Sequence, residues 1–222
     1  MSKEKWERRY AEREDAPGEP NPVFVEEVEG LPPGRALDLA AGDGRHAIYL
    51  ARRGWQVTAV DFSQTALERG ERFAAAAGIG SGAEKKGPQP GVPGVGEGGA
   101  IEWVQGDLTE YSPPPGRFDL VTIMFLHIPW EEMKSVLRRA KQAPAAGGIF
   151  LLMGHHRDNL GRGTGGPQDP GVLYTENDVT GVLSELEILR AEAIERRPEH
   201  AGEATAEPGA LALDCLVRAR RR

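Results

Sequence analysis

The sequence predicts an α/β protein built on a mostly parallel sheet, and three observations support this fold class. Segments rich in β-branched and apolar residues alternate with segments of helical spacing along most of the chain. The first strand, residues 35–39, runs into a glycine turn that opens a helix. The last two strands, about 187–197 and 210–219, have only a turn-rich link between them and should pair antiparallel. We therefore expect seven strands, helices on both faces and a closing hairpin.

The other elements follow from local signals. Ser63 is expected to cap the helix that follows the second strand, and Thr175 with Asp178 resembles a capping box. The predicted strands are 56–60, 101–104, 118–124 and 149–153, and the predicted helices are 45–53, 64–77, 130–142 and 176–185. Residues 78–100 are rich in Gly and Pro and predict a flexible insertion. The long loop over 154–174 is expected to be functional or disordered.

Length and composition limit the possible classes. A chain of 222 residues suits one domain, which we divide into an N-terminal helical lid, 1–34, and a main domain, 35–222. The net charge of −7 lacks the basic field of a bulk nucleic-acid binder. The single cysteine, Cys215, fits a reducing compartment. No apolar run reaches membrane-spanning length and no signal region opens the chain, so a cytoplasmic protein without a membrane partner is expected.

The N-terminal segment carries two aromatic residues on one helix face. Trp6 and Tyr10 stand four residues apart within the charged stretch 3–14. One interpretation is a surface helix pinned by two rings, and the other is a lid whose aromatic face closes over a ligand. Asn21 is expected to cap a short helix that begins at Pro22.

Side chains able to contact a ligand follow the predicted strands. Asp61, Asp107, His127 and His155 all stand just past the carboxyl ends of strands, as does the turn from Gly42 to Gly44. In open α/β sheets that edge is where ligands bind. The convergence predicts one ligand site at this edge.

Two cofactors are compatible with the glycine turn alone. The pattern Gly42-x-Gly44-x-x-Ala47, with Asp61 near the ~20-residue spacing of a ribose-binding acid, satisfies a dinucleotide fingerprint. Asp38 counts against it, because a pyrophosphate-binding strand is normally an unbroken apolar run. The closing hairpin also replaces the repeated half-unit of a dinucleotide fold.

The same residues resemble another family. The pattern Asp38-x-Ala40-x-Gly42-x-Gly44 is similar to the acid-x-Gly-x-Gly-x-Gly motif of class I S-adenosylmethionine-dependent methyltransferases, with Ala40 at the first glycine position. Residues 37–39 and 44–51 resemble the tellurite-resistance and thiopurine methyltransferase-like group, in which an asparagine is expected where His46 stands. The resemblance implies a Rossmann-like class I methyltransferase fold and S-adenosyl-L-methionine as the cofactor.

The resemblance also implies roles for individual residues. Asp61 would accept the two ribose hydroxyls, although a helix cap is an alternative. Asp107 would accept from the adenine amino group beside the backbone of Leu108, although a turn residue is an alternative. Asp38 would orient the amino-acid end. The complete cofactor-binding set is Trp6, Tyr10, Asp38, Ala40, Gly42, Gly44, Asp61, Phe62, Asp107, Leu108 and Phe125.

The acceptor side is less defined by the sequence. A soft acceptor, such as a thiolate or a metalloid oxyanion, needs no base, whereas a hydroxyl or amine does. His127 is the predicted catalytic base, with a packing or capping histidine as the alternative. The adjacent His155 and His156 lack the Cys or carboxylate spacing of a metal site, so no metal is expected.

The predicted function is transfer of a methyl group from S-adenosylmethionine to a small-molecule acceptor by in-line displacement. A monomer or weak homodimer without a nucleic-acid partner is expected. The alternatives are an NAD(P)-dependent oxidoreductase and a non-catalytic adenosyl-nucleoside-binding protein.

Overall fold

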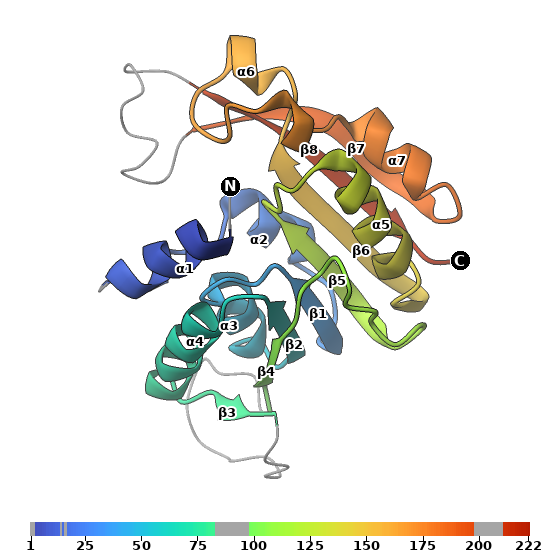
Figure 1. Ribbon diagram of the computed structural model, residues 1–222. Helices are drawn as coiled ribbons and strands as arrows, with labels where there is room; N and C mark the ends of the chain where they lie inside the picture. The colour runs from blue at the N-terminus through green and yellow to red at the C-terminus, as the bar shows by residue number, and fades with distance from the viewer. Residues whose placement is uncertain (1–2, 14, 16, 83–97, 198–210) are drawn as a thin grey trace. The chain divides into compact units, whose positions relative to one another are not determined.

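The computed structural model describes residues 3–13, 15, 17–82, 98–197 and 211–222. The strand order is β3-β4-β2-β1-β5-β6-β8-β7 (Figure 1). The chain divides into two compact units, one of Met1–Tyr111 with Arg117–Thr122 and one of Ser112–Gly116 with Ile123–Arg222. Strand β5, Phe118–Met124, begins in the first unit and ends in the second. The predicted α/β class with a mostly parallel sheet is confirmed.

The strands of the first unit run parallel to one another. They are β1 (Arg35–Leu39), β2 (Gln56–Asp61), β3 (Gly80–Ser81) and β4 (Ala100–Gln105). The register of β1 on β2 places Asp38 beside Ala59 and Leu39 beside Val60. Because Leu37 and Ile101 are completely buried, these strands carry the apolar core that holds the glycine turn.

The helices of the first unit are α1 (Lys3–Glu12), α2 (Pro22–Val28), α3 (Arg45–Ala51) and α4 (Gln64–Ala76). Two of these four, α2 and α4, begin at the caps that the sequence predicts. The Asn21 side chain accepts hydrogen bonds from the N–H groups of Val23 and Phe24, at 2.9 and 3.3 Å. Ser63 Oγ accepts from the N–H of Ala66 at 3.1 Å. Helices α3 and α4 contact β2 and β4, and α1 contacts α4.

The second unit contains the closing hairpin. Its strands are β6 (Pro144–His155), β7 (Glu187–Arg196) and β8 (Ala212–Arg220), and β8 pairs antiparallel with both of the others. Its helices are α5 (Trp130–Ala140), α6 (Asn159–Arg162) and α7 (Glu176–Val182), with a 3-10 turn at Pro170–Val172. Helix α7 contacts α5, β7 and β8, as Figure 1 shows. The predicted antiparallel pair is confirmed.

Three details differ from the sequence prediction. Strand β3 is an eighth strand inside the expected insertion, and its two residues are too few to show the alternating hydrophobic pattern of a strand. Residues 83–97 of that insertion lie outside the described part of the chain. Strand β6 begins at Pro144 instead of at 149, and backbone hydrogen bonds join Gly147 and Gly148 in this added part to Arg221. The expected long loop contains α6 and the 3-10 turn. Within the described residues, no helix is both long and apolar enough to span a bilayer.

Candidate cofactor and acceptor site

The turn between β1 and α3 has an unusual backbone. Ala40, Gly42 and Gly44 have φ angles of 62°, 57° and 78°, in the left-handed region. Glycine adopts this region without a steric penalty, whereas a residue with a Cβ loses about 1–2 kcal/mol there. The Ala41 N–H donates to the carbonyl of Val60 at 3.1 Å, which ties the turn to β2. The motif glycines are therefore explained by the backbone, and Ala40 takes the glycine conformation at a cost.

Asp61 is held against this turn at the end of β2. Its Oδ2 accepts from the N–H of Gly42 at 2.8 Å, and its Oδ1 accepts from the N–H of Ser63 at 3.0 Å. Burial raises the pKa of Asp61, and these two hydrogen bonds act in the opposite direction. The cap of α4 is Ser63 rather than Asp61. The Asp61 carboxylate is thus oriented by two backbone groups and keeps further lone pairs as acceptors.

Asp38 is a buried carboxylate with one unsatisfied oxygen. The residue is 1% exposed, and its Oδ1 accepts from the Thr122 hydroxyl at 2.8 Å. Its Oδ2 has no hydrogen-bond partner among the described residues. Burial raises the pKa of Asp38 to about 7. A buried acceptor of this kind fits a cationic partner, such as the ammonium group of an amino-acid cofactor.

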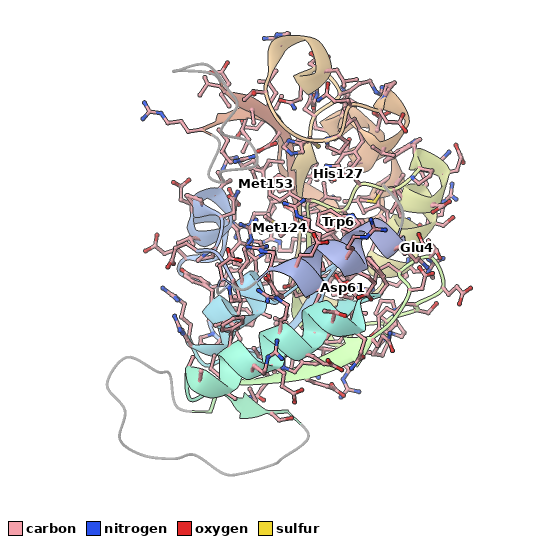
Figure 2. All side chains as sticks on the ribbon, turned by 60° about the vertical axis from the view of Figure 1, so that its left-hand side comes forward. Glu4, Trp6, Asp61, Met124, His127 and Met153 are labelled. Atoms are coloured by element: carbon pink, nitrogen blue, oxygen red, sulfur yellow. The ribbon has the colours of Figure 1, made fainter. Side chains whose placement is uncertain are left out.

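The aromatic face of α1 lies on the glycine turn. The rings of Trp6 and Tyr10 are stacked with centroids 5.8 Å apart, and Figure 2 labels Trp6 on α1. A Cβ added at Gly42 would lie only 2.5 Å from the Tyr10 hydroxyl oxygen. Burial, followed by the charges of Asp61 and Asp43, raises the pKa of Tyr10. The contact gives a structural reason why position 42 is a glycine.

Arginine contacts that the sequence did not reveal fasten the chain after α1. The Arg69 guanidinium donates to the carbonyls of Arg13 and, at 2.6 Å, Asp15. The carboxylate of Asp43 lies 3.8 Å from Arg13 and 4.0 Å from Arg69. Because Asp43 is a turn residue, these contacts connect the end of α1, the turn and α4. Nothing in the local pattern of α4 marks Arg69 as buried, so sequence reasoning had no signal for it.

Asp107 occupies the turn after β4. Its Oδ1 accepts from the N–H of Thr109 at 3.0 Å and from the Thr109 hydroxyl at 2.8 Å, and its Oδ2 accepts from the Lys3 ammonium. The Lys3 hydrogen bond is the main cause that lowers the pKa of Asp107. Leu108 is buried, and the Lys3 ammonium lies 6.0 Å from the centroid of Phe62. Asp107 therefore makes the turn that the alternative interpretation expected, and its contact with adenine stays a prediction.

His46 has a packing role. Its Nε2 accepts from the backbone N–H of Asn21 at 3.3 Å, and its ring lies 4.4 Å from that of Phe24. Burial lowers the pKa of His46 well below the usual value, so the ring is neutral. His46 stands where the resembled group is expected to have an asparagine, and its contacts join the start of α2 to α3.

His127 lies in the second unit, after β5. Its Nε2 accepts from the backbone N–H of His155 at 3.0 Å, and the two rings stack with centroids 5.2 Å apart. Burial, followed by the charge of His155, lowers the pKa of His127 to about 3. Phe125 begins this segment with a φ of 58°, and its N–H donates to the carbonyl of Met153 at 2.7 Å; Met153 and His127 are labelled in Figure 2. The base role of His127 stays a prediction, and its geometry favours positioning.

His155 belongs to a buried polar chain that the sequence did not reveal. Its Nδ1 lies 2.9 Å from Oδ1 of Asp214, a residue that is completely buried. The other oxygen of Asp214 accepts from Nε of Arg196 at 2.6 Å. The Arg196 guanidinium lies 5.4 Å from the centroid of Phe125. Charged residues inside the two closing strands were the available signal for Asp214 and Arg196.

The loop after β6 is held by one buried amide. Asn159 is 2% exposed; its Nδ2 donates to the carbonyls of Thr164 and Gly165 at 3.4 and 2.9 Å, and its Oδ1 accepts from the N–H of Leu213 at 2.7 Å. His156 has a different acidic neighbour from His155: its Nε2 lies 3.2 Å from the carboxylate of Glu176. Among the described residues, no group of three or more potential ligands could hold a metal ion.

About half of the chain matches a known protein family. Residues 37–152, which include the end of β1, the glycine turn, Asp61 and β5, match the model of the methyltransferase domain family. The chain belongs to this methyltransferase family. It is therefore an enzyme whose cofactor is S-adenosylmethionine, and the buried Asp38 oxygen and the left-handed turn fit that group. Membership decides against the nicotinamide alternative.

Solved structures share the fold of this methyltransferase. A S-adenosylmethionine-dependent methyltransferase from Methanosarcina mazei is similar over 92% of this chain and 99% of its own, with a TM-score of 0.65 and 16% identity. TehB from Haemophilus influenzae is similar over 91% of this chain and 63% of its own, with a TM-score of 0.67 and 15% identity. Magnesium protoporphyrin IX methyltransferase from Synechocystis, with bound S-adenosylmethionine, covers 99% of this chain and 79% of its own, with a TM-score of 0.59 and 15% identity. Each of these structures is less than 25% identical to the chain, so the likeness shows the fold. No curated protein matches.

Proposed function

We propose that this methyltransferase transfers the methyl group of S-adenosylmethionine to a small-molecule acceptor by in-line displacement. The observation that carries the proposal is the pair of carboxylates at the turn. Asp61 is fixed by the Gly42 N–H at 2.8 Å, and Asp38 presents a buried oxygen without a partner among the described residues. These are the acceptors that a nucleoside amino acid requires at its ribose and at its ammonium group.

In this proposal the residues of the chain bind and orient rather than carry out acid–base chemistry. The sulfonium of the cofactor supplies an electrophilic methyl group. Asp38 binds the ammonium group, Asp61 accepts from the ribose hydroxyls, and the turn brings backbone close to the amino-acid end. The N-terminal segment, 1–34, acts as the lid, since Tyr10 already lies on Gly42. Alignment in a closed site supplies much of the rate acceleration of such a displacement.

A small acceptor is favoured by the charge of the protein. The net charge is −7, and three basic side chains of the first unit lie beside acidic partners: Arg13 and Arg69 beside Asp43, and Lys3 beside Asp107. A phosphate backbone would have to compete with those carboxylates. Among the described residues the large exposed apolar side chains are Ile188 and Leu189 alone, which supports a monomer or weak homodimer.

Calorimetry with S-adenosylhomocysteine tests the cofactor site. Asp61→Ala should weaken binding at least tenfold, because it removes the acceptor for two hydroxyl groups. Asp119→Ala is the matched control: Asp119 also accepts from a backbone N–H, that of Arg35 at 2.7 Å, but at the other end of β1. Equal affinity of the Asp61 variant and the wild type would contradict the assignment.

The acceptor is then sought among small thiols, metalloid oxyanions, phenols and amines, with formation of S-adenosylhomocysteine as the readout. A duplex DNA and a transfer RNA serve as macromolecular comparisons. Turnover with a small molecule supports the proposal. Turnover with the DNA or the transfer RNA and with none of the small molecules would contradict the proposed small-molecule acceptor.

A further inference from the structure

We infer that Thr122 is a positioning residue for the cofactor: its hydroxyl holds the Asp38 carboxylate so that the second carboxylate oxygen binds the ammonium group of S-adenosylmethionine. The inference rests on the proposed function, which gives Asp38 that role, and adds the residue that controls Asp38. Both residues belong to the first unit, Asp38 in β1 and Thr122 in the part of β5 that this unit contains.

Thr122 brings a hydroxyl group into a buried apolar strand. The residue is completely buried, and its neighbours Leu120, Val121 and Ile123 in β5 are completely buried apolar residues. A valine of similar shape would fill the same space without the cost of burying a hydroxyl group. The hydroxyl therefore needs a hydrogen-bond partner, and the neighbouring strand β1 provides it.

The hydroxyl proton of Thr122 has two acceptors within reach. Its Oγ1 lies 2.8 Å from Oδ1 of Asp38 and 3.4 Å from the carbonyl oxygen of Leu37. A hydroxyl group has one proton to donate, and a carboxylate oxygen is a stronger acceptor than a carbonyl oxygen. The shorter distance and the charge both assign the proton to Asp38.

This hydrogen bond gives the two oxygens of Asp38 different roles. Oδ1 accepts from Thr122, whereas Oδ2 is buried and has no hydrogen-bond partner among the described residues. Because the bond restrains rotation of the carboxyl group, it also holds Oδ2 in one orientation. Asp61 is oriented by two backbone N–H groups, which no substitution of its neighbours by ordinary residues removes. The orientation of Asp38 depends instead on a side chain, so it can be tested by mutation.

The same hydrogen bond favours the charged form of Asp38. Burial raises the pKa of this carboxyl to about 7, and the Thr122 hydrogen bond is the largest effect in the opposite direction. The charged groups that act on Asp38 are Asp61 at the end of β2, which raises the pKa, and Arg45 at the start of α3, which lowers it. Without the Thr122 donor the pKa should rise, and less of Asp38 would carry the charge that an ammonium group requires.

Carbon NMR of the aspartate carboxyl groups tests this control without any ligand. Asp38→Asn identifies the Asp38 resonance. Thr122→Val removes the donor and should raise the pKa of Asp38 by about 1–2 units, whereas Thr122→Ser keeps a hydroxyl group and should restore the wild-type value. Thr58→Val is the matched control and should leave this pKa unchanged, since the Thr58 hydroxyl donates to a different carboxylate, that of Glu102, at 3.3 Å. The same Asp38 pKa in Thr122→Val and in the wild type would overturn the inference.

Calorimetry with two ligands tests the role in cofactor binding. S-adenosylhomocysteine has an ammonium group, and methylthioadenosine has the same adenine and ribose but lacks the amino-acid end. At neutral pH, Thr122→Val should bind S-adenosylhomocysteine about tenfold more weakly than the wild type, because less of Asp38 is ionised. Its affinity for methylthioadenosine should equal that of the wild type. The loss should become smaller as the pH rises, and Thr122→Ser should bind both ligands as the wild type does.

Two binding results would refute the positioning role. One is an equal loss of affinity for both ligands, which would indicate a structural role of Thr122. The other is an unchanged affinity of Thr122→Val for S-adenosylhomocysteine at every pH. Thr122→Ala also lacks the donor and replaces Thr122→Val if the valine variant does not fold. Failure of the wild type to bind S-adenosylhomocysteine would instead reject the cofactor site of the proposed function, and the carboxyl titration would still confirm or refute the control of Asp38 by Thr122.

Discussion

Replacing Asp38 by asparagine should stabilise the cofactor-free protein at neutral and alkaline pH. The Asp38 carboxyl is 1% exposed, and one of its oxygens has no hydrogen-bond partner among the described residues. Burial raises its pKa from 3.8 to about 7, against the effect of the Thr122 hydrogen bond. Asparagine keeps the shape and the acceptor for Thr122 but carries no charge, so it avoids the cost of burying a carboxylate.

The magnitude and the sign follow from the two pKa values. The folded protein keeps a proton on Asp38 up to a pH of about 7, whereas the unfolded chain releases it above 3.8. Stability of the wild type should therefore fall as pH rises from about 4 to about 7, and the loss should be complete above that. About three pKa units at about 1.4 kcal/mol each give a loss of about 4 kcal/mol.

Urea unfolding at several pH values measures this difference. The free energy of unfolding of Asp38→Asn minus that of the wild type should increase by about 4 kcal/mol between pH 4 and pH 8. Glu71→Gln removes an exposed carboxylate from α4 and should show no comparable increase. A difference that is constant with pH would refute the argument that Asp38 is destabilised by burial.

The same carboxylate makes a prediction for the cofactor. If the ionised form binds the ammonium group, affinity for S-adenosylhomocysteine should fall as pH drops below about 7, by up to about tenfold per pH unit. Asp38→Asn should bind weakly and without this pH dependence. An Asp38→Asn variant that is more stable than the wild type and fully active would contradict the role of Asp38 in binding the cofactor.

Three further changes test the backbone around the site. Gly44→Ala should lower the free energy of unfolding by about 2–4 kcal/mol, because its Cβ would lie 2.3 Å from the Trp103 ring. Gly78→Ala is the control: Gly78 has a similar φ of +75° with nothing within 4 Å, so the substitution should cost only about 1 kcal/mol. Urea unfolding measures both. Ala40→Gly should raise the melting temperature, since it relieves a φ of 62° worth about 1 kcal/mol; a lower melting temperature would contradict the strain. Asn159→Ala should cost about 2–3 kcal/mol and expose the backbone of residues 163–166 to hydrogen exchange, and unchanged exchange would show that the amide does not fix the loop.

The features that sequence reasoning predicted are those encoded locally. Asn21, Ser63 and Thr175 cap helices within three residues of themselves, so their roles can be read from neighbouring letters. The glycine turn and the antiparallel closing pair likewise depend on short stretches. The matching family confirms the methyl-donor class that Asp38 suggested.

The features that it missed join residues far apart in the chain. Thr122 bonds Asp38 across 84 positions, and Arg69 bonds the carbonyl of Asp15 across 54. Asp214 reaches His155 because β8 pairs with β6 in a register that no local signal specifies. A periodic pattern tells which face of a strand is buried, but not which polar side chain of another strand will lie against it.

Trp103 shows how such a distant contact constrains the site. Its indole fills the space above Gly44 in the turn and above Gly70 in α4, where a Cβ would lie 2.3 and 2.6 Å from the ring. One side chain therefore restricts two glycines at once. A smaller residue at position 103 would remove this clash at both, while a Cβ at Gly70 would still lie 2.9 Å from the carbonyl oxygen of Asp43 and Gly44 would keep its φ of +78°. Directed evolution of the cofactor turn should therefore retain both glycines as long as Trp103 is present, because a single enlargement at either position meets the indole.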